Sequence, residues 1–194
     1  MTVRANKPAF NIREKLKSLD YSHLPYEKMP AGSVIQVYSK ESSNEYRGTV
    51  TGASGFVDVD EGYLFETLSF CPMFSNSKIL LQSSNVAVYE YGNSDDSFFM
   101  SAYVANSGAE VVQAVVLGTL GYEIFTSAYN GQVLSFNNII DASAFGGRTS
   151  NIRIRIGGLS VGSHNNVSIN RDAYSVSYAN NRNIVTFTLM EIKQ

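Results

Sequence analysis

Short apolar runs separated by polar turn formers make up most of the chain from residue 32 onward. The most informative stretch, residues 74–91, is FSNSKILLQSSNVAVYEY. It opens with a polar turn and is rich in β-branched and aromatic residues, which favour strands. One strand from Lys78 to Tyr91 would extend about 45 Å, so we expect a bend or bulge at Ser83 and Ser84.

Further stretches of this kind predict an all-β fold. We expect strands at 33–38, 67–74, 97–106, 111–120, 121–129, 134–140, 151–156, 161–169, 174–178 and 184–192, weaker ones at 46–51 and 56–59, a turn at 92–96 and a loop at 141–147. Residues 151–156 alternate Ile with Arg, which predicts one buried and one exposed face. About ten strands at regular spacing predict a two-sheet antiparallel sandwich of jelly-roll type.

Residues 1–31 follow a different pattern. Ile12, Leu16 and Leu19 recur at helical spacing with charges between them, and Asn11 with Glu14 resembles a capping box. This predicts a short amphipathic helix over 11–20, too short to persist alone in water. Its apolar stripe must pack on the protein's own sandwich or on a partner. An extended arm with Pro25 and Pro30 follows, so we divide the chain into an arm, 1–31, and a sandwich, 32–194.

Charge is distributed unevenly along the chain, although the net charge is only −2. Residues 1–40 hold seven Lys or Arg against three acids, residues 41–147 two against twelve, and residues 148–194 six against two. An acidic middle argues against nucleic-acid binding, which needs a basic face. The basic N-terminus suits an acidic partner instead.

Few residues are candidates for catalysis or metal binding. Asp58, Asp60 and Glu61 form the densest acidic cluster and are the candidate calcium ligands, but they lack the spacing of a twelve-residue calcium loop, so a solvated turn is the favoured interpretation. His23 lies in the arm and His164 in an expected turn, and no nucleophile elbow accompanies them. We predict a protein that is not an enzyme and uses no cofactor; glycosidase carboxylates far apart in the chain remain an open alternative.

The other special residues point to structure. The single cysteine, Cys71, lies between apolar neighbours, and we expect a buried, inert thiol. No signal peptide and no run of about twenty apolar residues is visible, so we expect synthesis in a reducing cytoplasm and no membrane insertion. Arg153 and Arg155 either coat a solvent face or pair with the acidic middle of a neighbouring subunit.

Several segments resemble a domain found in structural proteins of tailed bacteriophages. They are GSVIQV at 32–37, the proline corner Cys71-Pro72 leading into SNSKILL at 75–81, IRIR at 152–155 and TLMEI at 188–192. The N-terminal KPAFNIREKL at 7–16 is similar to virion-attachment leaders. The loop after the first strand departs from the usual pattern, so no ligand carries over.

The resemblance implies a virion protein assembled in the bacterial host cytoplasm as a homotrimer. Its anchoring residues would be Phe10, Ile12, Arg13, Leu16 and Leu19, which would bind other phage structural proteins, and Arg153 and Arg155 would lie at a subunit interface. A tail fibre or tail-associated receptor-binding protein, which would contact a host surface polysaccharide or receptor, is the leading hypothesis. A head-decoration or head-fibre protein is the alternative, and a carbohydrate-active jelly-roll enzyme is a third.

Overall fold

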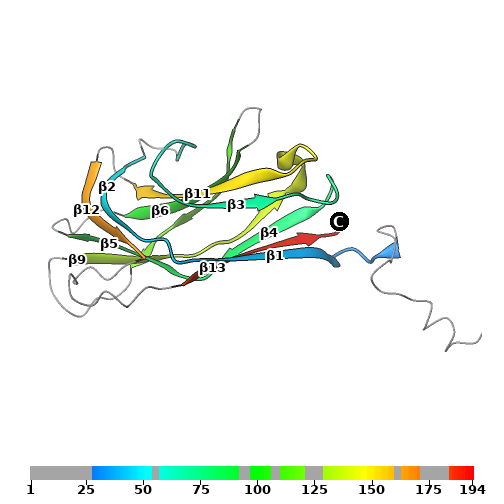
Figure 1. Ribbon diagram of the computed structural model, residues 1–194, viewed down its shortest axis with the longest axis horizontal. Coiled ribbons are helices and arrows are strands. Elements are labelled where there is room, and N and C mark those ends of the chain that lie inside the picture. Colours follow the sequence, from blue (N-terminus) through cyan, green and yellow to red (C-terminus); the bar gives the residue numbers. More distant parts are fainter. Residues whose placement is uncertain are drawn as a thin grey trace, which may run out of the picture.

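The fold is built almost entirely from strands (Figure 1). The computed structural model describes residues 28–53, 57–91, 97–105, 110–120, 129–159, 163–170 and 184–194. In these ranges the elements are β1 (Val34–Ser42), β2 (Tyr46–Thr51), β3 (Tyr63–Phe70), β4 (Lys78–Ser83), β5 (Val86–Tyr91), β6 (Phe98–Ala105), β7 (Val112–Leu117), β8 (Thr119–Leu120), β9 (Tyr129–Leu134), β10 (Asn137–Asp141), the 3-10 helix η3 (Ala142–Phe145), β11 (Ser150–Gly158), β12 (Ser163–Ile169) and β13 (Val185–Ile192).

Eight of these strands form the predicted jelly roll. Sheet I has the order β1-β13-β4-β10 and sheet II the order β3-β11-β6-β7, with antiparallel neighbours throughout. Counted one to eight along the chain, the strands lie in the orders 1-8-3-6 and 2-7-4-5, the interleaving of a double-sheet jelly roll. The predicted all-β, two-sheet architecture is confirmed.

A third sheet, which the sequence did not predict, lies at one end of the roll. This end sheet has the order β2-β12-β5-β9-β8. Each of the four connections at this end supplies part of it: β2 lies between β1 and β3, β5 between β4 and β6, β8 and β9 between β7 and β10, and β12 between β11 and β13. Figure 1 shows it on the left, away from the C-terminus.

The opposite end, which we call the terminal end, holds the C-terminus, the corner between β3 and β4, and Met29, which accepts a hydrogen bond from Lys193. The register fixes this arrangement, because Val34 at the start of β1 lies opposite Ile192 at the end of β13. The two ends of the roll are therefore built differently: one carries the termini, the other a sheet made from connections.

The core lies between sheets I and II and follows the alternation of the strands. Ile152, Ile154 and Ile156 of β11 are fully buried, and so are Phe187 and Leu189 of β13. The buried face of β11 matches the alternation predicted for residues 151–156. Other large core residues are Phe65, Leu68, Phe98, Met100, Phe136, Phe145, Ile79 and Leu81.

The stretch 74–91 bends where expected. β4 belongs to sheet I and β5 to the end sheet, with Ser84 and Asn85 between them. The Ser84 backbone N–H donates to Thr186 O at 2.9 Å, and Ser84 Oγ accepts from Thr186 N at 2.9 Å. The serine step therefore lets one stretch of chain serve two sheets.

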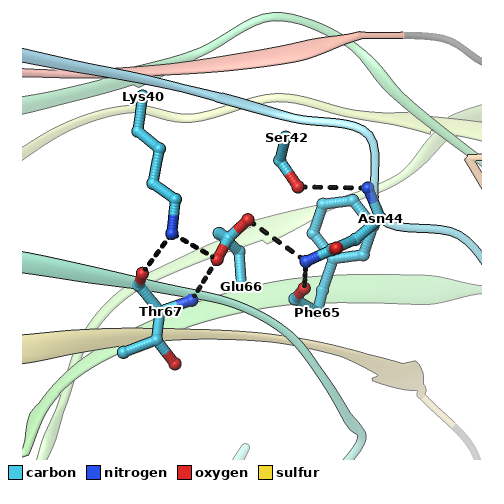
Figure 2. A network of polar contacts seen from close by, with 6 residues as sticks. All are labelled: Lys40, Ser42, Asn44, Phe65, Glu66 and Thr67. Carbon is cyan, nitrogen blue, oxygen red and sulfur yellow. Dashed lines mark hydrogen bonds and ion pairs between the residues drawn. The ribbon is translucent and has the colours of Figure 1, made fainter.

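The β1/β3 side of the sandwich is closed by polar side chains (Figure 2). Lys40 of β1 reaches across to Glu66 Oε1 at 2.9 Å and to Thr67 O at 3.0 Å. Asn44 Nδ2 donates to Phe65 O at 2.8 Å and to the second Glu66 oxygen at 3.1 Å. Charged side chains that point inward from an edge strand discourage pairing with another chain, so this side is protected.

Some predicted boundaries were wrong. The strand expected at 67–74 is β3, Tyr63–Phe70, and residues 71–74 form the corner instead. Residues 57–59 of the expected strand 56–59 are not extended in a sheet, and residues 135–136 interrupt the strand expected at 134–140. The predicted loop at 141–147 contains η3. The predicted elements at 11–20, 92–96 and 174–178, and all but the last residue of 121–129, lie outside the described residues.

Candidate interaction surfaces

The arm enters the fold at a hydrogen-bonded junction on the terminal end. Gly32 N donates to Lys193 O at 2.8 Å, and Lys193 N donates to Ser33 O at 2.9 Å. The ammonium of Lys193 also donates to Met29 O. The residues that follow the arm are therefore tied to β13, which pairs with β1 on one side and β4 on the other. A pull on the arm is transmitted into sheet I rather than into a loose loop.

A buried carboxylate holds the corner at the same end. Glu191 is 0% exposed, on the inward face of β13. Its oxygens accept from Met73 N at 2.8 Å, Phe74 N at 2.9 Å and Ser77 Oγ at 2.6 Å. Gln36 Nε2 adds a fourth contact at 2.6 Å. Buried charge requires such donors, so Glu191 fixes the corner to the last strand.

The outer face of sheet II brings together two of the predicted clusters. Arg155 donates from one terminal nitrogen to Asp60 O at 3.1 Å and to Gly62 O at 2.6 Å. Gly62 has a φ of +79°, and a Cβ there would lie 2.6 Å from Ile156 O, so only glycine fits this approach. Arg155 thus clamps the acidic turn of its own chain, while its buried Nε makes no hydrogen bond within the described structure.

The side chains of the acidic turn serve the turn itself. Glu61 Oε2 accepts from Asp58 N at 2.8 Å, and Asp58 Oδ1 accepts from Val59 N at 2.7 Å. Among the described residues, no group of three or more His, Cys, Asp or Glu side chains is arranged to hold a metal ion. Asp58, Asp60 and Glu61 are therefore seen as a turn, and calcium binding there stays untested.

Arg153, two residues before Arg155, contacts an aromatic ring of the same sheet. Its guanidinium lies 5.9 Å from the centroid of Tyr103 and donates to the Tyr103 hydroxyl at 3.3 Å. This hydrogen bond, with the charge interaction between the two groups, raises the pKa of Arg153 above its ordinary value. Both arginines therefore make contacts within their own chain, and their role at a subunit interface remains a prediction.

The outer face of sheet I carries a continuous apolar row. Val37 lies opposite Met190, Met190 opposite Leu80, and Leu80 opposite Ile139, so one residue from each strand lines up across the sheet. Val37 is 60% and Ile139 62% exposed, and the other two are half-buried. The next row is uncharged and polar: Ser39, Thr188, Gln82 and Asn137. On the other side of the apolar row, Lys78 pairs with Asp141.

The remaining candidates lie as follows. Cys71 is exposed, which corrects the expected buried thiol: the corner that Glu191 holds turns this position outward. His164 lies in strand β12 opposite Val50 and not in a turn. Phe10, Ile12, Arg13, Leu16, Leu19 and His23 lie outside the described residues. No helix among the described residues has the length and apolar character needed to cross a membrane.

Comparison with known proteins gives a weak likeness to virus particles. No family model and no curated protein matches the chain. The structure of infectious bursal disease virus Gt strain is 11% identical with a TM-score of 0.40, over 86% of this chain and 41% of that chain. The VP2 subviral particle of the same virus is 12% identical with a TM-score of 0.38, over 82% and 38%. The chain thus spans about two fifths of the length of these chains, and at such scores the likeness carries no functional argument.

Glu191 is the residue of greatest structural consequence that sequence reasoning missed. The signal was present, because Val185, Phe187 and Leu189 predict the inward positions of β13 and Glu191 continues their alternation. An acid at an inward position must be paired or hydrogen-bonded. Its partners in the corner lie 114 to 118 residues earlier in the chain, and sequence spacing gives no sign of them.

Proposed function

We propose that this protein is a non-enzymatic structural protein of a tailed-bacteriophage virion. Within that class we propose a tail fibre or tail-associated receptor-binding protein, held to the particle by its N-terminal arm as a homotrimer. The end sheet and the connections around it would then face outward, toward a host surface polysaccharide or receptor.

The observation that carries this proposal is the separation of the two ends of the roll. The arm enters at the terminal end, where Gly32, Ser33 and Lys193 tie its base to the middle of sheet I. All four connections at the other end contribute to one sheet. A domain that is attached at one end and carries an additional sheet at the other suits a protein that projects from a particle.

The physical link between two stretches that carry the phage resemblance adds support. TLMEI contains Glu191, and SNSKILL contains Ser77, which donates to Glu191 at 2.6 Å. The two stretches therefore cooperate in one structural device, the corner of the terminal end. This is a reason for both stretches to occur together in one protein.

Deleting residues 1–27 tests the attachment. The cut leaves Lys28–Ser33 and the junction with Lys193 in place, so the sandwich should keep its fold. We expect the shortened protein to be absent from particles purified from cells that make it, while the full chain is present. Leu16→Asp with Leu19→Asp should have the same effect, and Leu16→Met with Leu19→Met should not. Incorporation of the shortened protein at the level of the full chain would refute attachment through the arm.

A further inference from the structure

The apolar row on sheet I has the character of a covered surface. Val37, Met190, Leu80 and Ile139 align across all four strands, although an outward face of an antiparallel sheet is ordinarily polar. Contiguous apolar patches on a surface mark interaction sites when they are large, and here two exposed side chains flank two half-buried ones. Met190 in the middle is flexible and polarisable and adapts to a partner's shape.

We propose that the segment Phe10–Leu19 of the same chain packs on this row in the free protein. The described chain begins at Lys28, and the next residue, Met29, accepts a hydrogen bond from Lys193 at the end of β13. β13 and its neighbour β1 carry half of the row. Eight residues, 20–27, separate the segment from Lys28. The chain from Leu19 to Lys28 spans at most about 30 Å when extended. From Lys28 to Val34 the chain spans at most about 20 Å, and Val37 lies about 10 Å further along β1, so the extended link of about 30 Å is just long enough for the segment to reach the row of its own subunit.

The dimensions of the two apolar surfaces match. From Ile12 to Leu19 the stripe of a helix measures about 10 Å. The row crosses three strand spacings, about 14 Å in all. A helix laid across the strands would therefore set Ile12, Leu16 and Leu19 over the row, with Phe10 at its end. The polar row of Ser39, Thr188, Gln82 and Asn137 would border its charged side.

Docking on the same chain is favoured over docking on a second copy because the tether is short. A short link holds the segment near its own sheet at a millimolar effective concentration, far above the concentration of other copies in dilute solution. The inference concerns the isolated protein and does not depend on the virion role. If both hold, the stripe leaves the sheet when the arm binds the particle, because one stripe cannot cover both surfaces at once.

Tryptic cleavage of the full-length protein tests the docking. The segment contains Arg13, Lys15 and Lys17, and cleavage after them, followed by mass spectrometry, reports how often the segment leaves the sheet. We expect Val37→Asn with Ile139→Asn to speed this cleavage about tenfold. Both positions are more than half exposed, so the fold should persist. Glu41→Gln, an exposed position on β1 away from the row, is the matched control and should leave the rate unchanged.

A double-mutant cycle identifies the occupant. Leu16→Asp with Leu19→Asp should speed cleavage as the row variant does, and combining the two sets should add little further, because each alone already breaks the same contact. Independent, multiplying effects, or equal rates for the wild type and the row variant, would overturn the proposal. Protection that grows with protein concentration in step with association in light scattering would also overturn it, in favour of a neighbouring copy.

Discussion

At the scale of single residues, two buried carboxylates organise opposite parts of the sandwich. Glu191 holds the corner of the terminal end through Met73, Phe74 and Ser77. Glu66 closes the β1/β3 side with Lys40 and Asn44 (Figure 2). Both are acidic residues whose side chains point from their strands into the sandwich. The inward position of Glu191 follows from the alternation in β13, whereas Glu66 lies just before the strand predicted at 67–74. The partners of both acids come mainly from other parts of the chain and follow only from the fold.

Replacing Glu191 with Ala should destabilise the protein strongly. The change removes the acceptor of the buried Ser77 hydroxyl and of the part-buried N–H groups of Met73 and Phe74, and an unsatisfied buried donor costs about 1–3 kcal/mol. We expect the free energy of unfolding, measured in urea, to fall by about 3 kcal/mol or more. Glu191→Gln keeps one acceptor oxygen and should lose less. The exposed control Glu41→Ala should change by less than about 0.5 kcal/mol, and an equal effect for both alanine variants would contradict this role of Glu191.

The surroundings of Glu66 should make the free energy of unfolding depend on pH. Burial raises its pKa, but hydrogen bonds from Ser42, Lys40 and the Thr67 N–H, with the charge of Lys40, outweigh burial and leave the pKa below its ordinary value. A lowered pKa in the folded state stabilises the protein above the unfolded value of about 4.3, and this stability is lost as pH falls through the lower folded value.

Comparison of the wild type with Glu66→Gln isolates this contribution. Between about pH 6 and about pH 3 the wild type should lose more free energy of unfolding than the variant, because the other carboxylates are common to both. The measurement is chemical denaturation at a series of pH values. Parallel curves for the two proteins would show that the surroundings of Glu66 do not favour its charged form.

At the scale of elements, alternation of apolar residues predicted most strands and their buried faces. β11 and β13 were placed within one or two residues, since Ile152, Ile154 and Phe187 repeat with the period of a strand. The end of β3 was misplaced because residues 71–74 are as apolar as a strand. The backbone N–H groups of Met73 and Phe74 donate to Glu191 instead of to a neighbouring strand, so the end of β3 is decided by a residue distant in sequence.

The inward pair on the β1/β3 side should act against association. Replacing Lys40 with Met and Glu66 with Leu together removes both charges from this side, the half-buried Lys40 and the buried Glu66. The double change also removes the acceptor of the Asn44 amide and of the Thr67 N–H, so we expect the unfolding free energy to fall by about 1–3 kcal/mol. We also expect species larger than those of the wild type in light scattering, because the edge loses its protection.

The single variant Lys40→Met serves as the comparison for the double change. It leaves Glu66 buried without its cation and should lower the free energy of unfolding by about 3 kcal/mol. A double variant that keeps the oligomeric state of the wild type at high concentration would show that the charges close the sandwich without protecting its edge from association.

At the scale of the whole molecule, the sequence predicted the jelly roll but not the difference between its two ends. Strand number and alternation predict two packed sheets. The end sheet depends on pairings among four separate connections, such as Ser168 with Tyr89 and Val86 with Leu134. Nothing local in β2, β5, β9 or β12 specifies those neighbours, and so the difference between the two ends became visible only in three dimensions.

A receptor-binding role predicts competition for the host cell. Purified full-length protein, added to host cells before infection, should slow phage adsorption in proportion to its concentration, since it occupies the same receptors. The Arg153→Ala, Arg155→Ala variant, if these residues join the subunits, should be monomeric and compete less, because a trimer multiplies a weak site. Adsorption that is unaffected by a large excess of protein would count against receptor binding and favour the head-decoration alternative.

The most direct test of the proposed virion role is to locate the protein on purified particles. Gold-labelled antibody against the folded protein, viewed by electron microscopy, should mark the particle surface. Marking on tail fibres would support the leading proposal, and marking on the capsid would favour the head-decoration alternative. A protein abundant in the infected-cell lysate and absent from purified particles would contradict a virion role altogether.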